Sequence, residues 1–295
     1  MSELLASPHG TMAVLNEFGL RAKKKYGQNF LINRGVVDQI IDAADISEDD
    51  CVLEIGPGIG TMTQLLSEAA GHVVAVEIDH SLEPVLNRTL EDRDNVTILF
   101  QDILKTDLKK AAVEYNQGRP LKCVANLPYY ITTPILLQLF QEADCFESIT
   151  VMVQKEVADR ILATEKDREY GALSLAVRYY SEPELVCMVS PGSFIPRPGV
   201  DSAVLKLNIR KGAPVDADEA FLFALIRAAF NQRRKTLANA LSHGLDGSDE
   251  AVTREEVQGA LEKMGLSPTI RGEKLSLEQY AELSRHLRQK YESAV

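Results

Sequence analysis

The sequence predicts an α/β protein with a doubly wound, mostly parallel sheet, an antiparallel hairpin at the sheet edge, and a small all-α domain at the C-terminal end. From residue 51 to residue 154, short apolar runs alternate with helical segments, which is the pattern of repeated β-α-β units. The runs are hydrophobic almost throughout, as expected for parallel strands buried on both faces. Past residue 211 no further strand-like run occurs.

Five of the apolar runs are the predicted strands of the parallel sheet. They are CVLEIG (51–56), HVVAVEI (72–78), VTILF (96–100), LKCVAN (121–126) and ITVMVQ (149–154). Helices are predicted between them, the first at 61–70, where Thr61 and Gln64 fit a capping box. Two later runs, 184–190 and 202–209, have no helix between them and predict the antiparallel hairpin.

These elements predict a first domain over residues 1–211, whose opening stretch of about 48 residues forms an N-terminal arm. A polar, linker-like segment follows, and a second, helical domain is expected over residues 214–295. Ser276 and Gln279 fit a capping box at the start of its last helix. The predicted helices of this domain are 218–242, 254–264 and 276–290.

The composition is that of an ordinary globular protein and excludes several classes. The 295 residues are 45% hydrophobic and 25% charged, which suits a full-sized core. No window approaches the ~20 apolar residues that a membrane helix needs, and the N-terminus has neither a signal-peptide nor a transit-peptide pattern. A cytoplasmic protein without a membrane partner is therefore expected. The four cysteines form no CxxC pair and the five histidines are scattered, so no metal site is expected.

The net charge of −11 argues against wholesale wrapping of nucleic acid. Any contact with nucleic acid must come from local basic patches, and the sequence has two, RAKKKYGQNF (21–30) and FNQRRKTLANAL (230–241). A solvated surface is the alternative interpretation of either patch. The candidate nucleic-acid-binding residues are Lys23, Lys24 and Lys25 in the first patch, and Arg233, Arg234 and Lys235, on a predicted helix, in the second.

The glycine-rich segment LEIGPGIGTMT leads from the first predicted strand into the first helix. Gly56, Gly58 and Gly60 let the backbone turn sharply and approach a ligand closely. Glu77 ends the second strand and Asp102 follows the third, so both are expected at the carboxyl edge of the sheet, where ligands bind. There Glu77 can bind the ribose hydroxyls of an adenosine, and Asp102 can bind the adenine amino group.

The loop suits a nucleoside without phosphates better than a dinucleotide. Its spacing is G-x-G-x-G rather than G-x-G-x-x-G, and Pro57 and Ile59 crowd the position that a pyrophosphate would need. Glu54 would repel a pyrophosphate but tolerate a sulfonium. The predicted cofactor is therefore S-adenosylmethionine. NAD is the alternative, and a loop that only closes a strand–helix turn is the interpretation without a ligand.

The segment NLPYY, residues 126–130, ends the fourth predicted strand at the same edge. The Asn126 side-chain oxygen and the Leu127 carbonyl can accept both N–H groups of a nucleobase amine, which favours a pyramidal nitrogen whose lone pair faces a methyl group. Tyr129 offers a face for base stacking, worth roughly 1–3 kcal/mol. A strand-end turn with packed tyrosines is the alternative, and no role is predicted for Tyr130.

Six segments of the chain carry a resemblance to a known family. They are KKYGQNFL (24–31), VLEIGPGIGTMT (52–63), VEID (76–79), QDIL (101–104), NLPYYITTPIL (126–136) and SFIPRPGVDSAV (193–204). Together they resemble the KsgA-type small-subunit (16S) ribosomal RNA adenine dimethyltransferases. The similarity covers about residues 20–210, and the helical tail also fits in length. It implies a Rossmann-like class I methyltransferase fold for residues 1–211 and an rRNA- or ribosome-binding role for residues 214–295.

The resemblance also implies roles for individual residues. Asn29 and Leu31 belong to an N-terminal segment that closes over the methyl donor. The other donor-binding residues implied are Gly56, Gly58, Glu77, Asp102 and Asn126. The target amine would be held by Asn126, Leu127 and Tyr129, and Phe194 would stack on the second face of the adenine. For Phe194, a core aromatic is the alternative.

The implied activity is the transfer of two methyl groups from S-adenosylmethionine to each of two adjacent adenines near the 3′ end of 16S rRNA. The implied acceptor is a pre-assembled small subunit, a pre-30S or 30S particle, with a role in late subunit biogenesis, and the enzyme is expected to be a monomer. Three alternatives are kept: a 23S rRNA adenine dimethyltransferase of the macrolide-resistance type, an NAD-dependent oxidoreductase, and a non-catalytic assembly factor.

Overall fold

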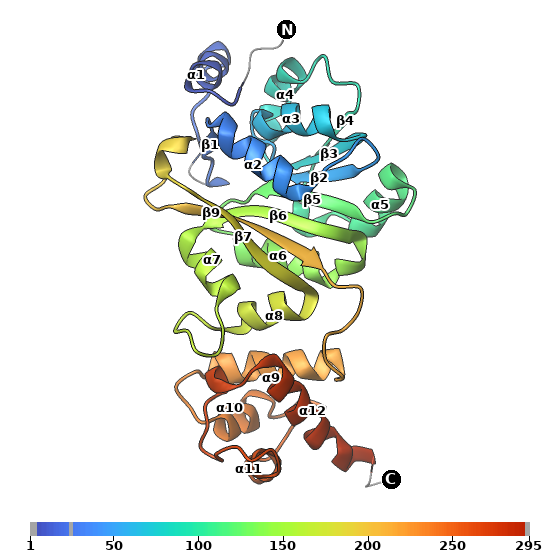
Figure 1. Ribbon diagram of the computed structural model, residues 1–295, viewed down its shortest axis with the longest axis vertical. Coiled ribbons are helices and arrows are strands. Elements are labelled where there is room, and N and C mark those ends of the chain that lie inside the picture. Colours follow the sequence, from blue (N-terminus) through green and yellow to red (C-terminus); the bar gives the residue numbers. More distant parts are fainter. Residues whose placement is uncertain (1–4, 24–25, 293–295) are drawn as a thin grey trace. The chain divides into compact units, whose positions relative to one another are not determined.

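The computed structural model describes residues 5–23 and 26–292. Contacts divide the chain into two compact units, of which the first contains the β-sheet and the second is helical (Figure 1). The units are Met1–Ala158 with Glu182–Ile209, and Asp159–Ser181 with Arg210–Val295. Residues 159–181, expected in the first domain, thus belong to the second unit, because α8 (Ala172–Tyr180) packs against α9 (Glu219–Asn231).

A seven-stranded sheet forms the centre of the first unit (Figure 1). Its strands are β2 (Cys51–Ile55), β3 (His72–Glu77), β4 (Val96–Phe100), β5 (Leu121–Asn126), β6 (Phe146–Gln154), β7 (Ser181–Val189) and β9 (Ser202–Ile209). Their order is β4-β3-β2-β5-β6-β9-β7. Neighbours from β4 to β6 are parallel, whereas β9 runs antiparallel to β6. The predicted fold class is confirmed.

The register of the central strands determines which residues lie side by side at the carboxyl edge of the sheet. Ile55 at the end of β2 pairs with Val76 on β3 and with Ala125 on β5. All residues of β2 are buried, as expected for a strand covered on both faces. The residues that come next in the chain, among them Glu77 and Asn126, are therefore brought to the same end of neighbouring strands.

Helices cover both faces of this sheet. The helices that precede α8 are α1 (Pro8–Glu17), α2 (Arg34–Ala44), α3 (Thr61–Ala69), α4 (Glu83–Thr89), α5 (Leu108–Asn116), α6 (Thr132–Gln141) and α7 (Lys155–Leu162). The helix α2 contacts β5, β6 and β9, and α6 lies on the opposite face (Figure 1). The Asn33 side chain caps α2 by accepting from the Val36 amide, and Val36, Val37 and Ile40 on this helix are buried.

The predicted capping box of Thr61 and Gln64 is wrong. The residue before α3 is Gly60, with φ +92°, and it offers no side-chain cap. Gln64 is 3% exposed, and its side-chain amide donates to the Thr89 carbonyl at 3.1 Å. The amide therefore satisfies a buried contact with the end of α4 instead of turning back to the helix start.

A small antiparallel pair joins two distant parts of the first unit. β1 (Phe30–Leu31) pairs with β8 (Phe194–Ile195). The Ile32 backbone amide donates to the Ser193 carbonyl at 2.8 Å, and the Asn33 side-chain amide donates to the Ser193 hydroxyl at 3.2 Å. The N-terminal segment is thereby fixed beside the loop that precedes β9.

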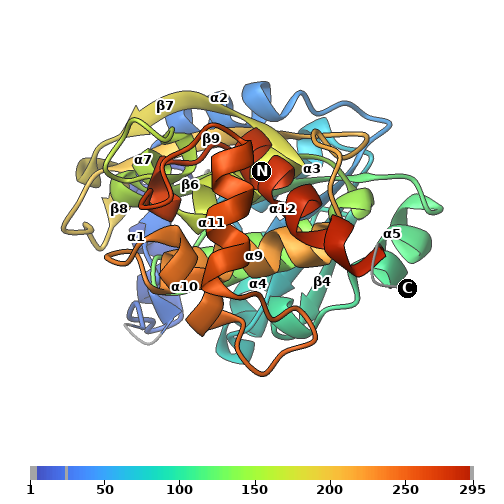
Figure 2. The same cartoon turned by 90° about the horizontal axis from the view of Figure 1, so that it is seen from below.

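The second unit is built from α8, α9 and three further helices (Figure 2). Its core includes Phe221, Leu241, Leu261 and Tyr280, each at most 2% exposed. The predicted capping box at Ser276 and Gln279 is confirmed by reciprocal bonds of 3.0 and 3.3 Å. The three further helices are α10 (Leu237–Gly244), α11 (Arg254–Lys263) and α12 (Leu277–Glu292).

The single predicted helix over 218–242 is wrong, because the chain turns between α9 and α10. The Lys235 amide bonds to the Gln232 carbonyl in this turn, and the Leu237 amide bonds to the Ile270 carbonyl at 2.7 Å. The turn lets Leu237 and the rest of α10 pack back against α9 and join its core. Arg233, Arg234 and Lys235 therefore lie in the turn and not on a helix.

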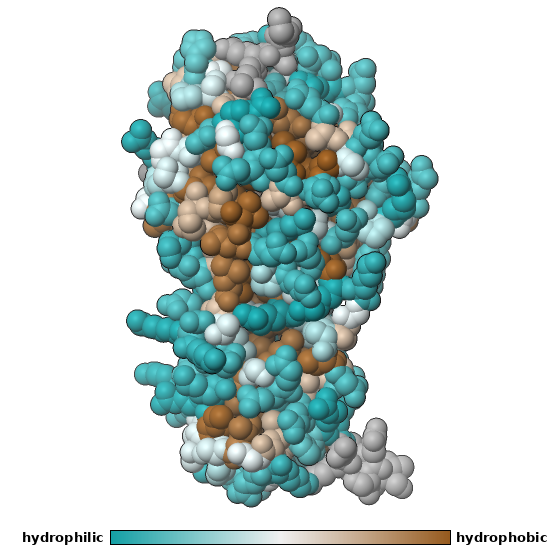
Figure 3. All heavy atoms as spheres, viewed as in Figure 1, coloured by the Kyte–Doolittle hydropathy of each residue, from teal (hydrophilic) through white to brown (hydrophobic). Residues whose placement is uncertain are grey.

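Hydrophilic residues cover most of the face seen in Figure 3, with hydrophobic residues in smaller patches. Across residues 5–23 and 26–292, no helix is both long and apolar enough to cross a membrane. In the same part of the chain, no group of three or more His, Cys, Asp or Glu side chains is arranged to hold a metal ion.

Gly272 offers a test of the packing of the second unit. A Cβ at this position would lie 2.6 Å from the Tyr280 hydroxyl and 2.8 Å from the Ala229 Cβ. Gly272→Ala is expected to lower the free energy of unfolding by about 1–3 kcal/mol, as overpacking does. The matched control is Gly259→Ala in α11, where a Cβ meets nothing within 4 Å, and helix propensity predicts a gain of up to about 1 kcal/mol. Urea unfolding followed by circular dichroism measures both, and equal effects would contradict the packing described.

Candidate functional site

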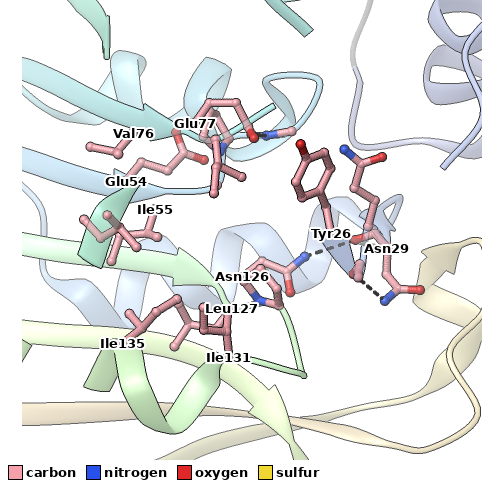
Figure 4. Close-up of a pocket in the computed structure, with 18 of the residues that line it drawn as sticks. Tyr26, Asn29, Glu54, Ile55, Val76, Glu77, Asn126, Leu127, Ile131 and Ile135 are labelled. Carbon is pink, nitrogen blue, oxygen red and sulfur yellow. Dashed lines mark hydrogen bonds between the residues drawn. The ribbon is translucent and has the colours of Figure 1, made fainter. Parts of the chain in front are cut away.

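A cavity lies at the carboxyl edge of the sheet (Figure 4). Glu54 and Glu77 lie on one side of it, and Tyr26 and Asn29 from the N-terminal segment lie on the other. The structure thus brings most of the predicted site residues together. Those that line the cavity are Asn29, Leu31, Gly56, Gly58, Glu77, Asp102, Asn126, Leu127 and Tyr129.

The glycine turn after β2 forms one wall of the cavity. Gly56 and Gly58 have φ values of +71° and +61°, which side chains other than glycine rarely adopt. The Gly56 amide bonds to the Val76 carbonyl at 2.9 Å, so the turn is tied to β3. A Cβ on Gly56 would meet no protein atom within 4 Å and would occupy space on the cavity side.

Two of the predicted carboxylates are held by backbone amides. Glu77 is 5% exposed and accepts from the Gly58 amide at 3.2 Å and from the Asp79 amide at 2.8 Å. Burial raises its pKa, although these bonds act in the opposite direction. Asp102 accepts from the Leu104 amide at 3.0 Å. Each carboxylate keeps lone pairs that can accept from a ligand hydroxyl or amine.

Glu54 is the most unusual group in the site. It is fully buried on β2, and among the described residues neither carboxylate oxygen has a hydrogen-bond partner. Burial raises its pKa from the usual 4.5 to about 8. The nearby Thr63 hydroxyl acts in the opposite direction, and the Glu77 carboxylate adds to the rise. A buried acid without a partner is costly, so this position is suited to a cation or a hydrogen-bond donor supplied by a ligand.

The N-terminal segment is anchored to Asp79, which follows β3. The Lys23 ammonium lies 2.9 Å from one Asp79 oxygen, and the Gln28 amide donates to the other at 3.1 Å. Burial alone would raise the pKa of Asp79, but the bonds from Lys23, Ser81 and Gln28 outweigh it and hold the pKa below its usual range. Lys23 is thus engaged in an internal ion pair. Lys24 and Lys25 lie outside the described residues.

The same segment contacts the asparagine turn at the end of β5. The Asn126 side-chain amide donates to the Asn29 carbonyl at 3.1 Å (Figure 4). Because the amide nitrogen is used in this bond, the side-chain oxygen is directed away from Asn29 and can accept a bond from a ligand. None of the described residues donates a hydrogen bond to the Asn126 side-chain oxygen.

Tyr129 and Phe194 have different environments. The partly buried Tyr129 lines the cavity, and its hydroxyl lies 2.6 Å from the Ser202 hydroxyl. Phe194 is 1% exposed and packs in the core with Leu31 and Val37. Phe194 thus occupies the position of the core aromatic kept as the alternative and does not line the cavity, and its stacking on a target adenine stays a prediction.

Several residues that line the cavity were not predicted, among them Tyr26, Gln28 and Tyr130. Tyr26 and Gln28 flank Gly27, whose φ of +60° reverses the chain there. Tyr130 is 57% exposed, and its ring lies 3.3 Å from the position of a Gly27 Cβ. The aromatic and amide residues around the glycine in KKYGQNFL are the sequence feature that could have indicated a binding segment. Nothing local indicated that this segment reaches β3 and β5.

A sequence model of the family described as "Ribosomal RNA adenine dimethylase" matches residues 19–287. The chain belongs to this family. The match spans both units, and the predicted resemblance is confirmed. The protein is therefore an rRNA adenine dimethyltransferase, and the oxidoreductase alternative has no support.

Named relatives of this dimethyltransferase match it over nearly their whole length. A protein of Lachnoclostridium phytofermentans named "Ribosomal RNA small subunit methyltransferase A" is 54% identical over 283 residues, 95% of this chain and 96% of the relative. One of the same name from Alkaliphilus metalliredigens is 45% identical over 284 residues, 96% of this chain and 98% of the relative.

Solved structures agree with the fold of the dimethyltransferase. A dimethyladenosine transferase from Plasmodium falciparum has a TM-score of 0.72 at 28% identity, covering 88% of this chain and 98% of that one. The 23S rRNA methyltransferase ErmE has a TM-score of 0.66 at 26% identity, covering 88% and 100%. Family and fold imply S-adenosylmethionine as the cofactor, and the open space at Gly56 and the unpartnered Glu54 carboxyl fit such a ligand.

The buried Glu54 predicts a pH dependence of stability. Its pKa is raised on folding, so the stability it confers is fully present below about pH 4.5 and is lost as the pH rises through about 8. Each pKa unit corresponds to about 1.4 kcal/mol. As the pH rises from 5 to 9, the free energy of unfolding of Glu54→Gln is therefore expected to increase by a few kcal/mol relative to that of the wild type. Urea unfolding without ligand measures this difference. The exposed Glu48→Gln is the control, and a Glu54→Gln difference that does not change with pH would contradict the assignment.

Proposed function

We propose that this dimethyltransferase transfers methyl groups from S-adenosylmethionine to the amino groups of two adjacent adenines near the 3′ end of 16S rRNA. The proposed acceptor is a pre-30S or 30S particle, with a role in late subunit biogenesis. The observation that carries the proposal is the cavity in which Glu77 and Asp102 face the asparagine turn. The names of the relatives support the small-subunit substrate, and such a substrate implies a cytoplasmic enzyme.

The residues of the cavity divide into a nucleoside end and a reactive end. Glu77, fixed by two backbone amides, is proposed to accept bonds from the ribose hydroxyls, and Asp102 from the adenine amino group. Burial raises the pKa of Glu54 to about 8, and the cationic part of the cofactor is proposed to favour its ionised form, since a nearby positive charge lowers the pKa of a carboxyl group. When bound, S-adenosylmethionine supplies a methyl group on a sulfonium centre.

The asparagine turn is proposed to hold the target amine. Asn126 accepts one N–H of the adenine amino group through its side-chain oxygen, which the bond to Asn29 orients, and the Leu127 carbonyl accepts the other. Two acceptors favour a pyramidal nitrogen with its lone pair directed at the methyl group. Tyr129 provides the stacking face. No residue needs to act as a strong base, because the product ammonium is acidic, so positioning accounts for most of the catalysis.

The three residues of the second basic patch are not equally available for the proposed RNA contact. Arg233 donates to Glu273 at 2.7 Å and to the carbonyls of Arg168 and Tyr170 at 2.7 and 3.0 Å, so its guanidinium is engaged within the second unit. Arg234 and Lys235 are exposed in the same turn. We therefore assign the RNA contact of the second unit to Arg234 and Lys235, with phosphates as their partners.

Asn126→Ala tests the proposed mechanism. The variant keeps the Leu127 carbonyl but loses the oriented acceptor, so its methylation rate is expected to fall on the order of a hundredfold or more. Its affinity for S-adenosylhomocysteine, measured by isothermal titration calorimetry, is expected to change only modestly. Asn208→Ala on β9, which removes an exposed bond to Glu184, is the control. Unchanged turnover in Asn126→Ala would mean that the asparagine is structural.

The acceptor is tested by offering both ribosomal RNAs to the purified enzyme. Immature 30S particles that lack the modification and naked 23S rRNA are incubated with methyl-labelled S-adenosylmethionine, and fully modified 30S particles are the control. We expect label in adenines of the immature particles only. Methylation of 23S rRNA alone would assign the enzyme to the macrolide-resistance type.

A further inference from the structure

The Tyr129 ring is held at both ends, and the outer anchor comes from a distant strand. At its inner end the ring belongs to the turn after β5, where the Ile131 amide and the Thr132 hydroxyl both bond to the Pro128 carbonyl, at 3.2 and 3.1 Å. At its outer end the phenol lies 2.6 Å from the Ser202 hydroxyl, 73 residues further along the chain.

Ser202 is a rigid anchor. It is 0% exposed and is the first residue of β9, where it pairs with Gln154 at the end of β6. The adjacent Asp201 carbonyl accepts from the Lys155 amide at 2.9 Å. The backbone that carries the Ser202 hydroxyl is therefore fixed by its pairing with β6 and by the bond between Asp201 and Lys155.

A tyrosine without an outer anchor would rotate about its two side-chain torsions, and a base that stacks on it would have to restrict this motion. The Ser202 bond removes much of this freedom before any ligand arrives, which is how a binding residue is preorganised. We propose that Ser202 is a positioning residue, whose hydroxyl sets the plane of the Tyr129 ring for stacking on the target adenine. This inference rests on the proposed stacking role of Tyr129.

The test compares Ser202→Ala, Tyr129→Phe and the double variant in steady-state methylation of immature 30S particles. Each single variant removes one partner of the same hydrogen bond, so we expect kcat/KM for the particle to fall about three- to tenfold in each. The double variant is expected to lose no more than either single variant, because both changes remove one interaction. The affinity for S-adenosylhomocysteine is expected to stay at the wild-type value in all three.

A matched serine controls for the loss of a buried hydroxyl. Ser148 on β6 is 4% exposed, and its hydroxyl has no partner among the described residues. Ser148→Ala is expected to keep the wild-type kcat/KM. If Ser202→Ala lowered only the melting temperature and left kcat/KM unchanged, Ser202 would be structural. If the losses of the two single variants multiplied in the double variant, the residues would act independently. Either result overturns the inference.

Tyr129→Ala separates this inference from the proposed function. If Tyr129→Ala leaves kcat/KM unchanged, the stacking role itself fails, and the role of Ser202 fails with it. If Tyr129→Ala lowers kcat/KM strongly while Ser202→Ala and Tyr129→Phe do not, only the positioning role of Ser202 is overturned.

Discussion

The parallel register of β2, β3 and β5 is the constraint on which the site depends. Ile55 is opposite Val76 on one side and Ala125 on the other, so three chain segments leave the sheet at the same level. This level places the glycine turn, the Glu77 carboxylate and the Asn126 amide around one cavity. Because a parallel strand cannot slip without breaking its bonds to both neighbours, the relative position of these groups is set by the core and not by the loops that carry them.

The register alone does not make the site complete, because the sheet edge is open until the N-terminal segment covers it. This segment is held at three places: by Lys23 and Gln28 on Asp79, by the pairing of β1 with β8, and by the Asn29 carbonyl on Asn126. The bond between Asn29 and Asn126 links the N-terminal segment to the asparagine turn. The orientation of the Asn126 amide therefore depends on the position of a segment about one hundred residues earlier in the chain.

The sequence indicates most of what is periodic or local, and little of what is long-range. Strands β4, β5 and β9 begin and end at the predicted residues, because polar residues on both sides of a continuous apolar run mark where a buried strand begins and ends. The residues expected to bind the methyl donor line the cavity at the edge of the sheet, where the motifs placed them. The Phe194 ring, the break after α9 and the use of Gln64 are decided by contacts with residues distant in the chain, and local pattern contains no information about these.

The asparagine turn illustrates this limit at the level of single bonds. Its motif specifies an acceptor and a flat face, yet each of the two depends on a partner outside the motif. Asn126 is oriented by Asn29 from the N-terminal segment, and Tyr129 by Ser202 from β9. An amide that could flip, or a ring that could swing, would present the wrong atoms to a target base for part of the time. The geometry of the asparagine turn therefore depends on three segments that meet at one edge of the sheet: the turn itself, the N-terminal segment and the start of β9. A chain with an intact motif but a displaced N-terminal segment would keep the Asn126 oxygen but lose its orientation.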